Sequence, residues 1–174
     1  MIEEAYKTCI EMLEQRGYTN IKTNEDTNSS SICMASREDN KDMISVIFVG
    51  DIKLTVQHIR QYLGEMDIIK CVHCIIIHGN SVTPAAKKFA KENEDKKVEL
   101  FCESELIYNI TTHSCVPKHT RLSNDESVEF KNKYGTNFPS ILRSDPISRF
   151  YGFSKGDIIE IEDLDEIIKY RIVK

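Results

Sequence analysis

Hydrophobic positions in the first hundred residues switch repeatedly between helical and strand spacing. The pattern predicts helices over 2–13, 54–63 and 84–93, and strands over 32–35, 43–49, 70–78 and 98–102. Residues 22–31 are rich in Asn, Thr and Ser, so we expect a loop there. Alternating strands and helices are typical of an α/β domain with a small mixed sheet flanked by helices.

The pattern changes near residues 109–113, where the long apolar runs end. Ser123 and Glu126 have capping-box spacing and predict a helix over 125–134. Asp145 followed by Pro146 predicts the start of a short second helix. Two or three short strands are expected after it, which is an α+β arrangement.

Two domains are therefore expected, 1–108 and 109–174. The 174 residues are 40% hydrophobic and 29% charged, which is ordinary for a globular protein without a membrane span. The acidic start of the chain has no apolar signal core, so we expect an intracellular protein whose six Cys are free thiols. A net charge of −5 argues against a free-standing nucleic-acid binder, which is normally basic.

Two Cys and His groupings have a spacing that could suggest a metal site. Cys71 and Cys74 lie within the predicted 70–78 strand, where an odd offset would place them on opposite faces. His113, Cys115 and His119 match no closed zinc set that we can justify. We expect no metal on this chain and interpret these residues as structural or interface residues.

A nuclease centre is a competing hypothesis for the first domain. Asp39 or Asp42 followed by Asp51 and Lys53 has the order of acidic residues and lysine found in restriction-type nucleases. Two carboxylates would hold Mg²⁺, and the lysine would position or activate a water molecule. Short Asp and Lys patterns are frequent in a chain this charged, so a solvated turn is the simpler interpretation.

The Thr83-Pro84 pair predicts a capped helix start after an apolar strand. Backbone N–H groups beyond such a cap point outward and can bind an anion such as a DNA phosphate. Lys87 and Lys88 follow on the polar face of the same helix. From the residues alone, a surface helix with solvated lysines is the simpler interpretation.

Several motifs occur in an order that indicates a known family. They are Arg16-Gly17-Tyr18, Thr83-Pro84-Ala85-Ala86-Lys87, Leu100 to Leu106, Asn109 to His119, Ser123 to Glu126, Asp145 to Gly152, Gly156 to Ile161 and Tyr170 to Val173. The ordered set resembles the fifth subunit of eukaryotic RNA polymerases. Its C-terminal part resembles the small archaeal polymerase subunit in which this module stands alone. The likeness runs nearly end to end and is weakest over 24–42.

The resemblance implies a non-catalytic subunit of a multisubunit DNA-directed RNA polymerase in the nucleus. Residues 1–108 would be the jaw domain, with Thr83, Pro84, Lys87 and Lys88 close to downstream duplex DNA. Residues 109–174 would be the assembly module that docks on the largest subunit. The implied assembly and interface residues are His113, Val116, Pro117, Lys118, His119, Asp145, Pro146, Arg149, Tyr151, Gly152, Tyr170 and Arg171.

Further implications concern what the chain would not do by itself. The catalytic Mg²⁺ would lie on the largest subunit, so no cofactor, small-molecule substrate or membrane is expected here. Partners would be the rest of the polymerase and transcription factors. An adaptor that binds regulators without joining the enzyme is a third hypothesis.

Two features depart from the family pattern. Phe138-Pro139-Ser140 stands where the family has Leu-Pro-Arg, so the arginine contact is missing unless Arg143 replaces it. The acidic stretch 162–166 replaces the family's Ser-Glu-Thr-Ala-Gly segment. The Ile, Asn and Lys content suggests an AT-rich genome. A parasite or a large DNA virus would fit, and a virus would place the protein in a cytoplasmic viral factory or a virion.

Overall fold

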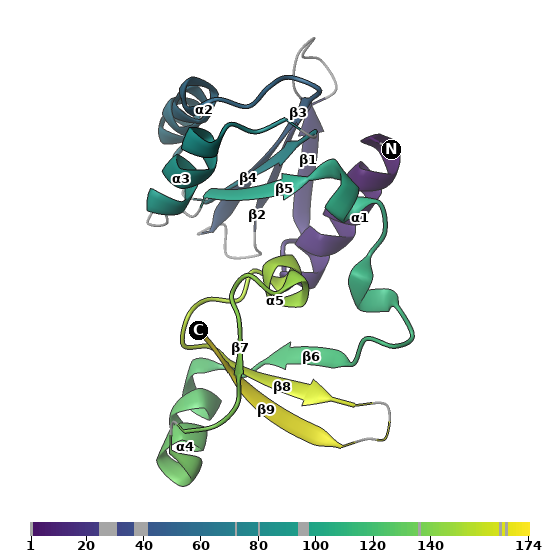
Figure 1. The fold of residues 1–174 in the computed structure, drawn as a ribbon, viewed down its shortest axis with the longest axis vertical. Helices are drawn as coiled ribbons and strands as arrows, with labels where there is room; N and C mark the ends of the chain where they lie inside the picture. The colour runs from purple at the N-terminus through teal and green to yellow at the C-terminus, as the bar shows by residue number, and fades with distance from the viewer. Residues whose placement is uncertain are drawn as a thin grey trace. The chain divides into compact units, whose positions relative to one another are not determined.

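The computed structural model describes residues 2–24, 31–36, 42–71, 73–79, 81–93, 98–135, 137–163, 165 and 167–174. These residues form two compact units, Met1–Tyr108 and Asn109–Lys174. Asp39 lies outside the described residues. Both units combine helices with a mixed sheet (Figure 1), so the predicted α/β and α+β fold class is confirmed.

The N-terminal unit contains a five-stranded sheet with helices on both faces. Its elements are α1 (Ile2–Gln15), β1 (Asn20–Asn24), β2 (Ser31–Ser36), β3 (Met43–Gly50), α2 (Val56–Ile69), β4 (His73–His78), α3 (Pro84–Glu92), β5 (Val98–Cys102) and the 3-10 helix η2 (Glu103–Leu106). The strand order is β1-β2-β3-β4-β5. The first three strands pair antiparallel, and β3, β4 and β5 run parallel.

Strand β3 lies at the centre of this sheet and is buried on both faces, from Ile44 to Val49. On one face Tyr6 of α1 contacts Phe48, with ring centroids 5.5 Å apart. On the other face Ile47 belongs to a core shared with α2 and α3. Figure 1 shows α1 on one side of the sheet and α2 and α3 on the other. Such two-sided cover explains why β3 and β4 are apolar almost throughout.

Two sequence predictions in this unit are wrong: the start of the loop expected over 22–31 and the start of the strand expected over 70–78. The polar segment Asn20–Asn24 is a strand, because β2 supplies a complete antiparallel partner for it. Strand β4 begins at His73 rather than at residue 70, because Lys70 ends α2 in the left-handed conformation at φ 56°. Cys71 therefore lies before the strand and not within it.

The C-terminal unit has a four-stranded sheet with one helix of 11 residues. Its elements are η3 (Ile110–Thr112), β6 (Lys118–Arg121), α4 (Asn124–Tyr134), β7 (Ser140–Ile141), α5 (Pro146–Tyr151), β8 (Ile158–Glu162) and β9 (Ile168–Val173). The order is β6-β8-β9-β7, with only β7 and β9 parallel. Phe153, Ile159, Ile161 and Val173 form its core. Across both units, no described helix is long and apolar enough to cross a membrane.

Candidate functional site

The start of α3 has the cap that the sequence predicts. The Thr83 hydroxyl accepts a hydrogen bond from the Ala86 N–H at 3.2 Å, and Pro84 occupies the first turn. Pro84 has no N–H to leave unsatisfied, so it fits this position. Since Pro84 is exposed, the start of this helix is open to solvent.

A short backbone ladder places the starts of α2 and α3 side by side. The Leu54 N–H donates to the Ser81 carbonyl at 2.9 Å, and the Thr83 N–H donates to the Leu54 carbonyl at 3.1 Å. Leu54 and Val82 form a parallel bridge. Both helices follow parallel strands, and their positive dipole ends lie at the same edge of the sheet.

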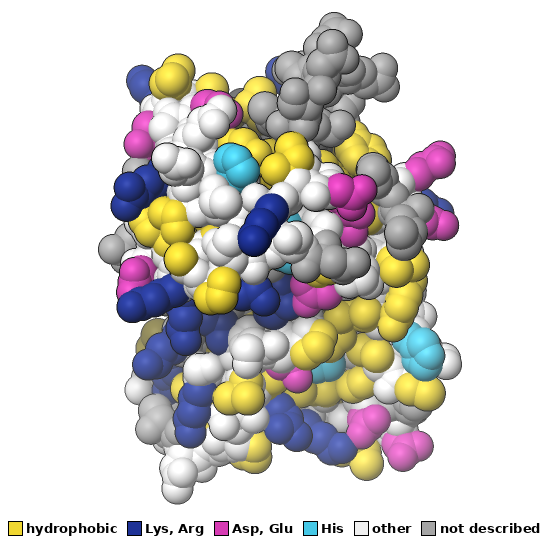
Figure 2. All heavy atoms as spheres, turned by 45° about the horizontal axis from the view of Figure 1, so that its top comes forward, with side chains coloured by type: hydrophobic (Ala, Val, Ile, Leu, Met, Phe, Trp, Pro, Cys, Tyr) yellow, Lys and Arg dark blue, Asp and Glu magenta, His cyan; other side chains and the backbone are white. Residues whose placement is uncertain are grey.

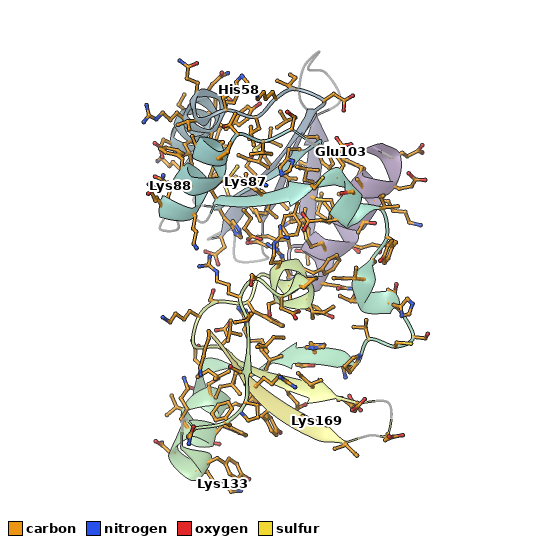
Figure 3. The ribbon with its side chains drawn as sticks, in the orientation of Figure 1. His58, Lys87, Lys88, Glu103, Lys133 and Lys169 are labelled. Carbon is orange, nitrogen blue, oxygen red and sulfur yellow. The ribbon has the colours of Figure 1, made fainter. Side chains whose placement is uncertain are left out.

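Lys87 and Lys88 are exposed on α3, where Figure 3 labels both. The Lys88 ammonium lies 3.6 Å from the Glu92 carboxylate, and both side chains are largely solvated. An exposed pair of this kind is weak, so Lys88 can be drawn away by another anion. Figure 2 shows Lys and Arg side chains, in dark blue, on the face of the molecule in view, although the chain has a net charge of −5.

The residues suggested for a nuclease centre do not come together. Asp42 precedes β3, whereas Asp51 and Lys53 follow it, and all three are exposed. A strand rises about 3.3 Å per residue, so the eight residues of β3 alone span roughly 23 Å between Asp42 and Asp51. Two carboxylates at that distance cannot bind one Mg²⁺, so Asp42, Asp51 and Lys53 do not form the site proposed from the sequence. Among the described residues, no three His, Cys, Asp or Glu side chains are placed to hold a metal ion.

The strand argument about Cys71 and Cys74 is also corrected. Both thiols lie in the same buried core, beneath α2 and α3. Cys71 Sγ donates to the backbone carbonyl of Met43 at 3.0 Å. Burial raises the pKa of both thiols, and for Cys74 the nearby Cys71 and Glu99 raise it further. Buried in this way, the two thiols pack as small apolar groups of the core.

A charge network that the sequence did not reveal joins α1 to the sheet. Arg16 donates to both Glu99 oxygens, at 3.0 and 2.8 Å, and His73 Nε2 lies 2.5 Å from Glu99 Oε1. Burial alone would raise the pKa of Glu99. The Arg16 charge and the hydrogen bonds from His73 and Arg16 lower this pKa well below its usual range. These three residues are far apart in the sequence, so no local motif marks them.

The residues that precede β6 are held by local hydrogen bonds. The Cys115 N–H donates to Nδ1 of the exposed His113 at 3.2 Å, and His119 Nδ1 donates to the Pro117 carbonyl at 2.8 Å. Val116 and Pro117 are half-buried. The segment is therefore held by contacts between its own side chains and backbone, and His113 stays exposed.

The start of β6 adds one further charge contact. The Lys118 ammonium lies 3.4 Å from the Glu162 carboxylate of β8, and both side chains are exposed. The side chain of Lys118 is therefore accessible on this edge strand.

The Asp145 segment forms the short helix that the sequence predicts. Asp145 Oδ1 accepts from the Ile147 N–H at 2.9 Å, and Gly152 ends α5 in the left-handed conformation at φ 65°. Tyr151 stacks on Phe153 with ring centroids 5.2 Å apart. Pro146 is exposed, and Arg149 is half-buried.

The predicted C-terminal residues stabilise the second sheet from strand β9. The Tyr170 hydroxyl donates to Glu160 at 2.8 Å, and the Tyr170 ring packs on Phe130 of α4 with centroids 4.5 Å apart. Arg171 donates to the Ser140 carbonyl at 3.2 Å. These contacts give Tyr170 and Arg171 roles within the unit, whether or not they also meet a partner.

A polar cleft lies beside α4, and the sequence did not predict it. Its volume is about 590 Å³, and it is lined by Arg121, Leu122, Ser123, Asn124, Ser127, Val128, Lys131, Gly156 and Asp157. The lining comes from two stretches of the chain, residues 121–131 and residues 156–157, so no local sequence spacing could have indicated it. Lys131 of α4 donates to the Gly156 carbonyl at 3.3 Å.

Comparison with known proteins gives two family matches. Residues 108–173 match the family described as RNA polymerase Rpb5, C-terminal domain. Residues 3–110 match the family described as Restriction endonuclease, so the N-terminal unit belongs to that domain family. Within this matched unit, Asp42, Asp51 and Lys53 do not form the metal-binding arrangement suggested from the sequence.

Relatives align with nearly the whole chain. The DNA-directed RNA polymerases I, II, and III subunit rpabc1 of Dictyostelium discoideum is 31% identical over 95% of this chain and 93% of its own. The 454R protein of Invertebrate iridescent virus 6, provisionally named as a DNA-directed RNA polymerase subunit, is 31% identical over 100% of both chains. The RPABC1 subunit of Caenorhabditis elegans is 30% identical over 82% of this chain and 72% of its own. As a whole, the chain belongs to the Rpb5, or RPABC1, family of DNA-directed RNA polymerase subunits.

Proposed function

We propose that the chain is a non-catalytic subunit of a multisubunit DNA-directed RNA polymerase. The observation that carries the proposal is the similarity to named polymerase subunits across both structural units. The catalytic Mg²⁺ would belong to another subunit. The protein would act in the nucleus of a eukaryote, or in a viral factory or virion if a large DNA virus encodes it, since relatives of both kinds exist.

The C-terminal unit would dock on the largest polymerase subunit. Its match to the Rpb5 C-terminal family and its exposed Lys118 and Pro146 support this assignment. The N-terminal unit would form the jaw beside downstream DNA and would also meet transcription factors. The solvent-open cap at Thr83, with exposed Lys87 and Lys88 behind it, suits one or two phosphates.

Charge reversal on α3 tests the DNA contact in the assembled enzyme. Lys87→Glu with Lys88→Glu should weaken the hold of the elongation complex on downstream duplex. Each lost phosphate contact should lower the salt slope of binding by about one unit. Lys7→Glu with Lys22→Glu, the same charge change on α1 and β1, is the matched control and should leave binding unchanged.

Crosslinking locates the contact directly. A photoreactive residue at position 84 should crosslink to downstream DNA in an elongation complex. Crosslinks to protein only, together with equal binding of the two double variants, would remove the DNA-contact role. The polymerase-subunit assignment would still stand in that case.

A further inference from the structure

The cleft beside α4 contains Lys131, which has no counter-charge among the residues that the structure describes. The carboxylate of Asp157 accepts the Ser154 N–H at 2.8 Å and lies 3.7 Å from Arg121. Half-buried Lys131 meets the Gly156 carbonyl at 3.3 Å and forms no ion pair with any described residue. An ammonium group has three donors, so at least two of them remain available in the cleft.

The rest of the lining suits a peptide better than a phosphate backbone. Val128 is 57% exposed beside Lys131, so the cleft also offers an apolar contact. Asp125 and Glu126 lie in the first turn of α4 next to this lining and would repel a continuous row of phosphates. A peptide can instead place a single carboxylate at Lys131 and an uncharged side chain on Val128.

We infer that this cleft receives an extended segment of a neighbouring polymerase subunit, with an Asp or Glu pairing with Lys131 and an aliphatic side chain covering Val128. The inference rests on the proposed function, because it specifies where part of the assembly contact is made. Charge complementarity selects this occupant: the carboxylate of Asp157 is already bonded within the chain, whereas Lys131 is not paired with the carboxylate of any described residue.

Neutralising the lysine tests the inference in the full-length chain. Tagged Lys131→Met should retain the large polymerase subunits about tenfold less well than wild type in a salt wash. Lys131→Arg should restore most of the retention. Lys133→Met is the matched control, because Lys133 is exposed two residues further along α4 and lies over the Tyr134 ring at 5.1 Å (Figure 3). The melting temperatures should be similar, since Lys131 makes a single hydrogen bond, of 3.3 Å, within the described part of the chain.

A photoreactive residue identifies the occupant. At position 128 it should crosslink to a polymerase-subunit peptide that contains Asp or Glu, whereas exposed position 132, outside the cleft lining, should not. Crosslinks to nucleic acid at 128, or equal retention of Lys131→Met and Lys133→Met, would overturn the inference and leave the proposed function intact. If the wild-type chain recovered no large polymerase subunit, the proposed function would fail together with this inference.

Discussion

Glu99→Gln tests the charge network that holds α1 against the sheet. The substitution keeps the size of the side chain but removes the charge that meets Arg16 and His73. The Arg16 side chain is only 3% exposed, so the substitution removes the carboxylate that faces a buried guanidinium. Breaking a buried pair in this way costs about 3–5 kcal/mol. Glu99 is 22% exposed, so we expect about 3 kcal/mol.

Thermal and urea unfolding of the isolated full-length chain measure this effect. For a chain of this length, about 3 kcal/mol corresponds to a fall in melting temperature of roughly 6–12 °C. Glu92→Gln breaks the solvated pair with Lys88 and is the control, for which we expect no measurable change. The double variant Arg16→Met with Glu99→Gln should recover part of the loss, because the buried guanidinium is removed together with its carboxylate partner.

The shifted pKa of Glu99 also predicts how the stability of the protein changes with pH. The folded state keeps Glu99 ionised far below its ordinary pKa of 4.5, whereas the unfolded state protonates near that value. The unfolded state therefore binds more protons in acid, and this stabilisation is complete at neutral pH and declines as the pH falls below about 4.5. The difference in unfolding free energy between wild type and Glu99→Gln should become smaller from pH 5 to pH 3. If this difference in unfolding free energy stayed constant from pH 5 to pH 3, ionised Glu99 would not stabilise the fold in the way described. A Glu99→Gln variant as stable as Glu92→Gln would have the same consequence.

Two further predictions concern buried side chains. Ser148 is 1% exposed, and its hydroxyl has no hydrogen-bond partner in the described part of the chain, so Ser148→Ala should stabilise the protein by about 1 kcal/mol in urea unfolding; a destabilised variant would show that the hydroxyl does bond. Cys115 is exposed, whereas Cys9, Cys71 and Cys74 are buried, so brief alkylation followed by peptide mapping should label Cys115 well before these three. Equal labelling of Cys74 would contradict the placement of strand β4.

Short sequence motifs predicted much of the fold because the interactions that they indicate form between residues close together in the chain. Thr83, Ser123 and Asp145 each cap the helix that the sequence assigned to them, since a cap needs only a side chain and the N–H groups two or three residues ahead. Strand β1 could not be predicted in this way. Its polar residues pair with β2, and a partner strand is not visible in the pattern of β1 itself.

The site residues follow the same division between local and tertiary features. Asp42, Asp51 and Lys53 are close in the sequence, but the eight residues of β3 hold Asp42 apart from the other two. In contrast, Arg16 and Glu99 are 83 positions apart and meet only because α1 packs on the sheet. The Lys131 cleft needs α4, the end of β6 and the 156–157 turn together. Features that depend on tertiary assembly were therefore the ones that the sequence could not supply.

Affinity purification of the full-length tagged chain from its native cell or virus tests the central claim most directly. Quantitative mass spectrometry should recover the two large polymerase subunits in an amount equal to the tagged chain after a stringent salt wash. An adaptor that binds regulators without joining the enzyme would recover regulators and no large subunits. Recovery of the chain without the large polymerase subunits would contradict its assignment as a polymerase subunit.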